Sequence, residues 1–383
     1  MTPVTNHKTW VEISSAALAS NIDNLQAALS PGVEFCAVIK ANAYGHGLSE
    51  VAHLALRSKV KTFAVDSLDE GLAVRTLDQT CSIFVLGMTP AIRFSEVISG
   101  RLIQTVYDAE SINKLAEAAK SLGATAYINL KLETGLYRQG MDTRELESVL
   151  EALQSNADQI TVVGVGSHFA NSEDLDRPEK TTHQIRIFET LLTQLAERGI
   201  TAQLIHLACS AAALTRASTQ YQMVRFGIVL YGLWPSTSVR RQVMLGRQRI
   251  ELEPILSWRT TIAQVKSIVP GNQVGYGGHF TANRPMRIAV LPVGYYDGYD
   301  RKLSNRGEVI VRGTRCRVLG NVCMNMVMID VSTVPAARAG DTVTLLGRDG
   351  MHAVTVDDLA ERASTINYEF VTRINPLLPR IVV

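Results

Sequence analysis

The sequence lacks the features that mark several classes of protein. Its 383 residues contain five cysteines, an odd number with no Cys-x-x-Cys pair, which indicates neither a disulfide framework nor a zinc site and favours a reducing cytoplasm. No stretch approaches the length of a membrane span, and residues 1–8 contain no apolar signal core. A net charge of only +2 gives no electrostatic basis for binding nucleic acid or an anionic membrane. We expect a soluble, cytoplasmic protein without a metal site.

What the chain does contain is a regular alternation of short β-rich runs and longer amphipathic segments. With 46% hydrophobic residues it can bury a large core, which predicts one big domain and a smaller one. Residues 109–119 place apolar side chains three and four apart and predict a helix that stops near Gly123. Eight β/α units favour an α/β fold, a (β/α)8 barrel of the TIM type. The predicted strands are 33–39, 61–65, 81–86, 102–106, 124–130, 160–165, 203–207 and 224–232.

The pattern of apolar residues changes after Trp234-Pro235. Helical periodicity fades, and short β-branched runs separated by Gly and Pro predict a C-terminal, mostly β second domain. We place the barrel at residues 11–236 and the β-rich domain at 237–383. The predicted strands of the second domain are 259–265, 287–291, 308–312 and 341–346.

The most informative segment, Lys40-Ala-Asn-Ala-Tyr44-Gly-His-Gly, follows the first apolar strand. A lysine at an apolar strand end is expected to lose hydration, which makes its neutral, nucleophilic amine more accessible. Taken alone, such a lysine is more often a surface residue whose stem covers apolar atoms. The string AVIKANAYGHG, however, resembles the pyridoxal-phosphate lysine motif of the alanine racemase family. The resemblance implies that Lys40 bonds covalently to pyridoxal 5'-phosphate and that Tyr44 contacts its phosphate.

The resemblance extends over nearly the whole chain and implies the rest of the cofactor site. Phosphate in barrel enzymes is often held by the loops after strands seven and eight, where Ser210, Gly227 and Ile228 lie. Ser210 also suits the N-cap of a helix starting at Ala211. The first strand, around Lys8 to Glu12, would by resemblance join the second domain, so that residues 1–10 pair with it. The implied cofactor-binding residues are Lys40, Tyr44, Leu86, His168, Ser210, Arg225, Gly227, Ile228 and Tyr368.

Arg225 is the element that bears most on the type of reaction. The family uses this arginine to contact the pyridine nitrogen of the cofactor, where most enzymes with this cofactor place a carboxylate. Because an arginine stays protonated, it donates a hydrogen bond to an unprotonated nitrogen and leaves the ring a weaker electron sink. A less stabilised carbanion is reprotonated promptly, which favours racemisation. Without the motif, a strand arginine is more often a surface or ion-pair residue.

Racemisation needs an acid/base group on each face of the α-carbon. The resemblance assigns one face to Lys40 and the other to Tyr276, which lies in Val-Gly-Tyr276-Gly-Gly and is supplied by the partner subunit. A tyrosine titrates near 10, so it needs a positive charge or a relay, for which His168 and Arg225 are candidates. A tyrosine that only packs its ring in a glycine turn is the plainer alternative.

Substrate recognition is implied by three further segments. Arg138 matches the family's arginine for the substrate carboxylate, and Lys131 matches a lysine that is carbamylated in many members and steadies that arginine. Met324 matches a backbone N–H donor from the other subunit, and Tyr295, with Tyr368, narrows the entrance so that a methyl side chain fits. The chain departs from the family pattern at several positions: Glu133 for Asp, Leu136 for Met, Gly166 for Tyr, Cys209 for Asn and Asn325 for Asp.

The resemblance therefore implies a homodimeric alanine racemase with shared active sites, supplying D-alanine for peptidoglycan. A broad-specificity racemase for serine or basic amino acids stays open, because a pocket that only excludes bulk discriminates by about 1–3 kcal/mol. A basic amino-acid decarboxylase of the same fold is disfavoured by Arg225 and the Tyr276 motif. A pyridoxal-phosphate carrier without turnover is the alternative from another class, but a carrier needs no second base.

Overall fold

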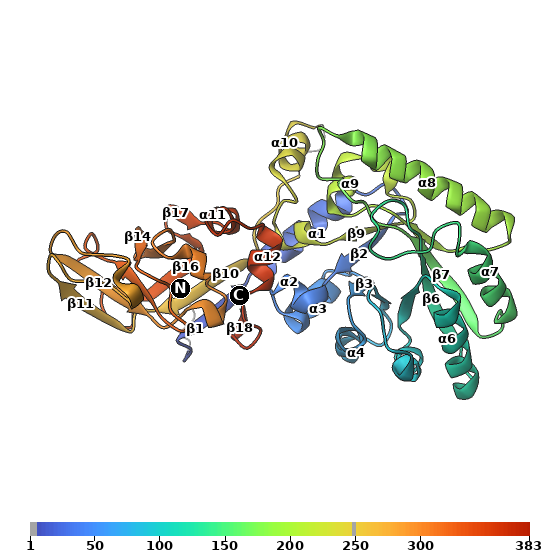
Figure 1. Ribbon diagram of the computed structural model, residues 1–383, viewed down its shortest axis with the longest axis horizontal. Helices are drawn as coiled ribbons and strands as arrows, with labels where there is room; N and C mark the ends of the chain where they lie inside the picture. The colour runs from blue at the N-terminus through green and yellow to red at the C-terminus, as the bar shows by residue number, and fades with distance from the viewer. Residues whose placement is uncertain (1–5, 247–249) are drawn as a thin grey trace. The chain divides into compact units, whose positions relative to one another are not determined.

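The computed structural model describes residues 6–246 and 250–383, and the chain forms two compact units (Figure 1). The barrel unit comprises Leu18–Ala43 and Val51–Glu253. The β unit comprises Met1–Ala17, Tyr44–Glu50 and Pro254–Val383, of which residues 1–5 lie outside the described part. The expected pairing of residues 1–10 therefore falls partly outside the described residues. No helix in the described part of the chain is long and apolar enough to cross a membrane.

Eight parallel strands form the sheet of the barrel unit, in the order β8-β7-β6-β5-β4-β3-β2-β9. The two ends of this order are joined by the parallel bridge between Cys209 and Arg225 and by the hydrogen bond from Arg225 N to Ala208 O (3.2 Å). The sheet therefore closes on itself, and the predicted barrel is confirmed. The strands are β2 (Glu34–Val38), β3 (Thr62–Val65), β4 (Ser82–Val85), β5 (Ile103–Val106), β6 (Ala126–Lys131), β7 (Ile160–Gly166), β8 (Leu204–His206) and β9 (Met223–Phe226).

Helices α6, α7 and α8 lie outside strands β6 and β7 (Figure 1). The predicted helix at 109–119 is α6, which begins behind the N-cap Asp108 and ends at Gly123 with φ 59°. Glycine suits this left-handed position because it has no Cβ. The helices are α1 (Ser15–Ala27), α3 (Leu48–Arg57), α4 (Leu68–Leu77), α5 (Phe94–Ser99), α6 (Ala109–Leu122), α7 (Leu146–Ser155), α8 (Pro178–Glu197), α9 (Ser210–Thr215) and α10 (Thr237–Leu245), with short 3-10 turns η1 (Ala91–Arg93) and η2 (Ala217–Thr219).

The last predicted barrel strand was too long. The strand β9 ends at Phe226, and residues Ile228–Tyr231 form the 3-10 turn η3 instead of continuing to 232. Gly227 adopts φ −102° and ψ −102°, outside the extended region, and so ends the strand. The run Ile-Val-Leu-Tyr is apolar and fully buried. A short apolar run is typical of a buried strand and of a buried turn alike, so the sequence did not distinguish the two.

The β unit is built on a sheet of ten strands in the order β11-β12-β15-β14-β13-β16-β10-β1-β18, with β17 beside β16. The strand β1 (Thr9–Ile13) pairs antiparallel with β10 and parallel with β18. The predicted strand 259–265 is in fact two strands, β10 and β11, which separate at Ile262 and Ala263. The strands are β10 (Leu256–Thr261), β11 (Gln264–Ile268), β12 (Met286–Leu291), β13 (Glu308–Val311), β14 (Thr314–Leu319), β15 (Val327–Asp330), β16 (Thr342–Asp349), β17 (His352–Val354) and β18 (Arg380–Val382).

Short helical elements lie between the strands of this unit and contain several predicted site residues. The turn η4 begins at Tyr276 and η5 begins at Tyr295, while Tyr368 lies in the first turn of α12. The elements are η4 (Tyr276–Gly278), η5 (Tyr295–Asp297), η6 (Arg301–Leu303), α11 (Val356–Arg362) and α12 (Asn367–Thr372).

Candidate active site

The carboxyl ends of the barrel strands gather most of the predicted site residues of the barrel unit. In parallel barrels, this is the end where loops carry binding and catalytic side chains. Two of the residues lie within strands and the others one to four residues after a strand. They are Lys40 after β2, Leu86 after β4, Lys131 at the end of β6, His168 after β7, Ser210 after β8 and Arg225 within β9.

Lys40 begins the segment α2 (Lys40–Tyr44), whose backbone is left-handed. Ala41, Asn42 and Ala43 have φ values of 54°, 54° and 52°, a conformation that is costly for residues with a Cβ. The Lys40 Nζ lies 3.6 Å from Asp66 Oδ1, and the lysine side chain is 36% exposed. The expectation of a dehydrated lysine at this strand end was therefore wrong, because the loop after β3 supplies a carboxylate and the side chain reaches solvent.

Glu70 ties the loops after β2 and β3 together. Its carboxylate accepts hydrogen bonds from the Asn42 N–H (3.1 Å) and the Asp66 N–H (2.9 Å). Glu70 is also the N3 residue of the capping box that begins α4 behind Ser67. One carboxylate thus fixes the backbone that follows Lys40 and the backbone that carries its ion-pair partner.

Arg225 is buried in the barrel, and its two terminal nitrogens are surrounded by acceptors. One contacts the Nδ1 of His206 and donates to the His206 carbonyl (3.2 Å). The other donates to the carbonyls of Ser167 (2.6 Å) and Leu207 (3.1 Å) and to His168 Nδ1 (3.3 Å). Its Nε–H makes no hydrogen bond with any described residue. The guanidinium is therefore held in one orientation and keeps one donor for a ligand.

Both histidines beside Arg225 are electrically neutral at neutral pH. Burial, followed by the positive charge of Arg225, holds the pKa of His168 and of His206 well below the usual value. Because arginine only donates, the Nδ1 of His168 accepts the Arg225 hydrogen bond. The proton of neutral His168 consequently lies on Nε2, which becomes a donor toward a further group.

Cations concentrate around Arg225 although the whole chain is nearly neutral. Burial and then the charges of Arg225 and Arg138 lower the pKa of Lys131 well below its usual value, with a smaller effect of Lys40. Glu133, which stands where the family has Asp, uses its carboxylate to accept from the N–H groups of Gly135 and of Leu136 (2.8 Å). This carboxylate thus shapes the loop before Arg138. Lys40, Arg138 and Arg225 make the site electropositive, and the lowered pKa of Lys131 favours its neutral amine.

The predicted phosphate side is built from the ends of β8 and β9. The Ser210 Oγ accepts a hydrogen bond from the Gly227 N–H (3.0 Å), so these two residues are in direct contact. The N-cap of α9 is Cys209, and Ser210 is the first helical residue, so its reading as an N-cap was wrong. Ile228 begins η3 directly after Gly227 and is buried. Leu86 is half-buried, and its N–H donates a hydrogen bond to the carbonyl of Val65 (2.9 Å).

The remaining predicted residues belong to the β unit. Tyr276 is 77% exposed in a turn in which Gly275, Gly277 and Gly278 all have positive φ. Met324 is 56% and Tyr295 42% exposed, and the Tyr295 N–H donates to the carbonyl of Cys323 (3.0 Å), which brings the Tyr295 and Met324 loops together. The rings of Tyr44 and Tyr368 lie 6.2 Å apart. This unit therefore presents an exposed aromatic and methionine surface.

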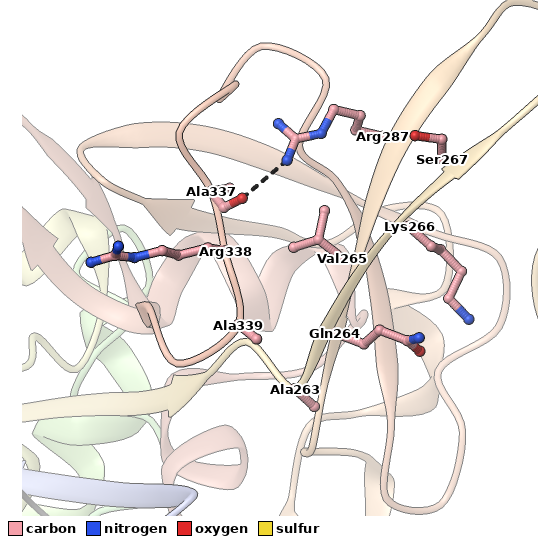
Figure 2. Close-up of a pocket in the computed structure, with 9 residues that line it drawn as sticks. All are labelled: Ala263, Gln264, Val265, Lys266, Ser267, Arg287, Ala337, Arg338 and Ala339. Atoms are coloured by element: carbon pink, nitrogen blue, oxygen red, sulfur yellow. Dashed lines mark hydrogen bonds between the residues drawn. The ribbon is translucent and has the colours of Figure 1, made fainter.

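A separate groove of 460 Å³ lies in the β unit and contains none of the predicted site residues. Figure 2 shows its lining from the β11 region, Arg287 and the segment Ala337–Ala339. The Arg287 guanidinium donates to the carbonyls of Pro335 (2.7 Å) and Ala337 (3.1 Å). Arg287, a residue of β12, thus holds the segment between β15 and β16 in place.

One residue beside the predicted site, Asp66, was not predicted from the sequence, and His206 was predicted to lie at the end of the seventh barrel strand but was given no role. Both follow or end an apolar barrel strand, and this placement was the signal that could have identified them. Asp66 contacts Lys40, and His206 contacts Arg225. These pairs join residues 26 and 19 positions apart in the sequence, and the barrel closure between β8 and β9 creates the second pair.

Comparison with known proteins gives a consistent result over the whole chain. The family described as "Alanine racemase, N-terminal domain" matches residues 13–235, and "Alanine racemase, C-terminal domain" matches residues 255–382. The alanine racemase of Leptospira interrogans serovar Lai is 36% identical over 98% of this chain and 96% of its own length. That of Desulfosudis oleivorans is 37% identical over 97% of this chain and 96% of its own. The Bacillus anthracis alanine racemase structure with bound L-Ala-P has a TM-score of 0.92 at 32% identity, covering 99% of this chain and 96% of the other.

Proposed function

The chain belongs to the alanine racemase family, and from this premise we propose that it interconverts L-alanine and D-alanine with pyridoxal 5'-phosphate as cofactor. The barrel, residues 11–236, holds the cofactor, and the β-rich residues 237–383 contribute to the site of a partner subunit. The working form is a homodimer. The observation that carries the proposal is the fixed Arg225 guanidinium among the cations at the carboxyl ends of the barrel strands.

The residues of the barrel unit fit this cofactor. The cofactor is an anion with a pyridine nitrogen, and Arg225 keeps an Nε–H donor that no described residue uses. When bound, the cofactor supplies the electron sink that acidifies the substrate Cα–H. Arg225 limits this sink, because its guanidinium donates a hydrogen bond without transferring a proton. The residues proposed to hold the cofactor are Lys40, Tyr44, Leu86, His168, Ser210, Arg225, Gly227, Ile228 and Tyr368.

Two side chains move the substrate proton, one on each face of the α-carbon. Lys40 Nζ takes or returns the proton on one face, and the partner subunit's Tyr276 does so on the other. The Nε2–H of neutral His168 suits the phenol oxygen of that tyrosine, because a donor there stabilises the phenolate form. The 77% exposure of Tyr276 supports its use by another copy of the chain.

The substrate carboxylate is bound by cationic and backbone donors. Arg138 supplies a planar guanidinium, and the N–H of the partner subunit's Met324 completes the set. Lys131, whose neutral amine is favoured by the lowered pKa, is proposed to add to carbon dioxide and release a proton to solvent, and the resulting carbamate steadies Arg138. Tyr295, with Tyr368, narrows the entrance to the size of a methyl side chain. The D-alanine formed would serve peptidoglycan synthesis in the cytoplasm.

The proposal is tested by incubating purified protein, loaded with pyridoxal 5'-phosphate, with L-alanine in deuterium oxide. We expect D-alanine to form and deuterium to enter the α-position at the same time. Parallel incubations with serine, lysine and arginine measure substrate breadth, and equal rates for these would favour the broad-specificity racemase. Release of carbon dioxide from lysine or arginine would indicate a decarboxylase. A lysine-linked cofactor without isotope exchange would contradict enzymatic activity and indicate a carrier.

A further inference from the structure

A row of polar side chains crosses the interior of the barrel beneath Arg225 and has no role in the function proposed above. Thr105 in β5 is paired in register with Asn129 in β6, and Asn129 is paired with Gly164 in β7. His206 in β8 is paired with Gly166, the second residue after Gly164. All the side chains of this row are buried: Thr105 is 5%, Asn129 1% and His206 2% exposed. Polar groups at this depth need partners.

The hydrogen bonds of the row fix the orientation of the Asn129 amide. The Asn129 Nδ2 donates to Thr105 Oγ1 (3.2 Å), so the amide turns its Oδ1 toward His206 Nε2, at 2.8 Å. An amide oxygen only accepts, and the guanidinium of Arg225 on the other side of the ring only donates. Both neighbours therefore require the same form of His206, neutral with its proton on Nε2 and a lone pair on Nδ1.

Two glycines provide the space that this arrangement needs. A Cβ at Gly164 would lie 2.7 Å from Asn129 Oδ1, and a Cβ at Gly166 would overlap the imidazole of His206. The β6–β7 register shifts between Ile128 and Asn129, which sets Gly164 opposite the amide. Phe84 packs edge-on against the imidazole at 5.9 Å. Gly166, a departure from the family pattern, thus lets the His206 ring occupy this position.

We propose that Asn129 is a positioning residue that selects the Nε2–H form of His206 and thereby holds the guanidinium of Arg225 in place. This inference rests on the proposed function for its consequence, which is the orientation of the Arg225 donor toward the pyridine nitrogen. The other tautomer would place an N–H against the guanidinium. The amide at 129 excludes that form because its oxygen has no proton to donate to an unprotonated Nε2.

The direct test is nuclear magnetic resonance of the full-length, cofactor-free protein labelled with 15N-histidine. The His206 signals are assigned by their loss in His206→Gln. We expect a protonated Nε2 and an unprotonated Nδ1 in the wild type. In Asn129→Leu, which keeps the volume but removes the amide, only Arg225 still favours the Nε2–H form, so we expect a smaller fraction of that form and a mixed pattern of His206 signals. A proton on Nδ1 in the wild type, or an unchanged pattern in Asn129→Leu, would overturn the proposal.

A second variant disturbs the position of the His206 ring directly. The Cβ added by Gly166→Ala would overlap the imidazole and displace it from its present contacts, so this variant should also change the His206 signals even if Asn129→Leu does not fold. Asn113→Leu, an exposed amide on α6, is the matched control and should leave the His206 signals unchanged. Unchanged signals in a folded Gly166→Ala would contradict the arrangement.

The loaded protein gives the second readout. Asn129→Leu and Gly166→Ala should each shift the visible absorption band of bound pyridoxal 5'-phosphate and lower kcat for alanine about tenfold, the typical effect of losing one buried hydrogen bond. If the wild type binds no cofactor, the proposed function fails while the tautomer measurement still tests this inference. If it racemises alanine but the variants keep the wild-type band and kcat, the positioning role fails alone.

Discussion

At the scale of single residues, the site depends on groups whose charge is set by their neighbours. Burial and nearby arginines favour neutral forms of Lys131, His168 and His206, so that they serve as a nucleophile, a donor and an acceptor. Arg225 keeps its charge and is fixed by the carbonyls of Ser167, His206 and Leu207. A fixed arginine and neutral histidines together suit a site that binds an anion and then moves a proton.

The lowered pKa of Lys131 makes a prediction about its reactivity. With 13C-labelled bicarbonate at pH 7.5, a carbamate carbon signal should appear in the wild-type protein, because only the neutral amine attacks carbon dioxide. The signal should vanish in Lys131→Met and persist in Lys120→Met, a change of an exposed lysine on α6. Absence of the signal from the wild type would refute carbamylation of Lys131.

The lowered pKa of His206 predicts how stability depends on pH. The folded protein keeps His206 neutral, whereas the unfolded chain takes up a proton below the ordinary value of about 6.5. The free energy of unfolding should therefore fall as the pH drops below this value, with His206 contributing up to about 1.4 kcal/mol per pH unit. Denaturant unfolding between pH 7.5 and 5 measures this slope. It should become shallower in His206→Gln and stay the same in His183→Gln, an exposed site; equal slopes in all three proteins would contradict the prediction.

At the scale of elements, the sequence predicted the barrel because its strands are short, apolar and regularly spaced between amphipathic helices. Its errors have local causes. Gly227 ended the last strand early, and the run 259–265 contained a break between two strands without Gly or Pro to mark it. The partners of the site residues were harder to predict, because Asp66 beside Lys40 and His206 beside Arg225 depend on which strands become neighbours. The left-handed segment after Lys40 gave no signal at all, since alanine disfavours that conformation.

This left-handed segment makes a prediction about stability. Ala41 is exposed and has φ 54°, so Ala41→Gly should relieve strain and stabilise the barrel by about 0.5–1 kcal/mol. The matched change Ala118→Gly, inside the right-handed helix α6, should instead destabilise by about 1 kcal/mol. Denaturant midpoints measure both. Destabilisation by Ala41→Gly comparable to that of Ala118→Gly would show that the segment is not left-handed in solution.

At the scale of the whole molecule, the proposed chemistry is divided between the two units. Lys40, Arg138 and Arg225 belong to the barrel unit, while Tyr276 belongs to the β unit, where it is exposed. A homodimer with shared sites gives each barrel a tyrosine from the other copy. In this arrangement each active site needs both chains, so a defect in one chain is complemented by the other.

The most direct test uses a heterodimer of two inactive chains, Lys40→Ala and Tyr276→Phe, carrying different affinity tags and purified as the mixed species. One of its two sites combines an intact Lys40 with an intact Tyr276 from the other chain, and the other site lacks both. We expect neither parent homodimer to racemise alanine and the heterodimer to show about half of the wild-type rate. A heterodimer as inactive as its parents would contradict the account, because it would mean that Tyr276 does not act across the subunits.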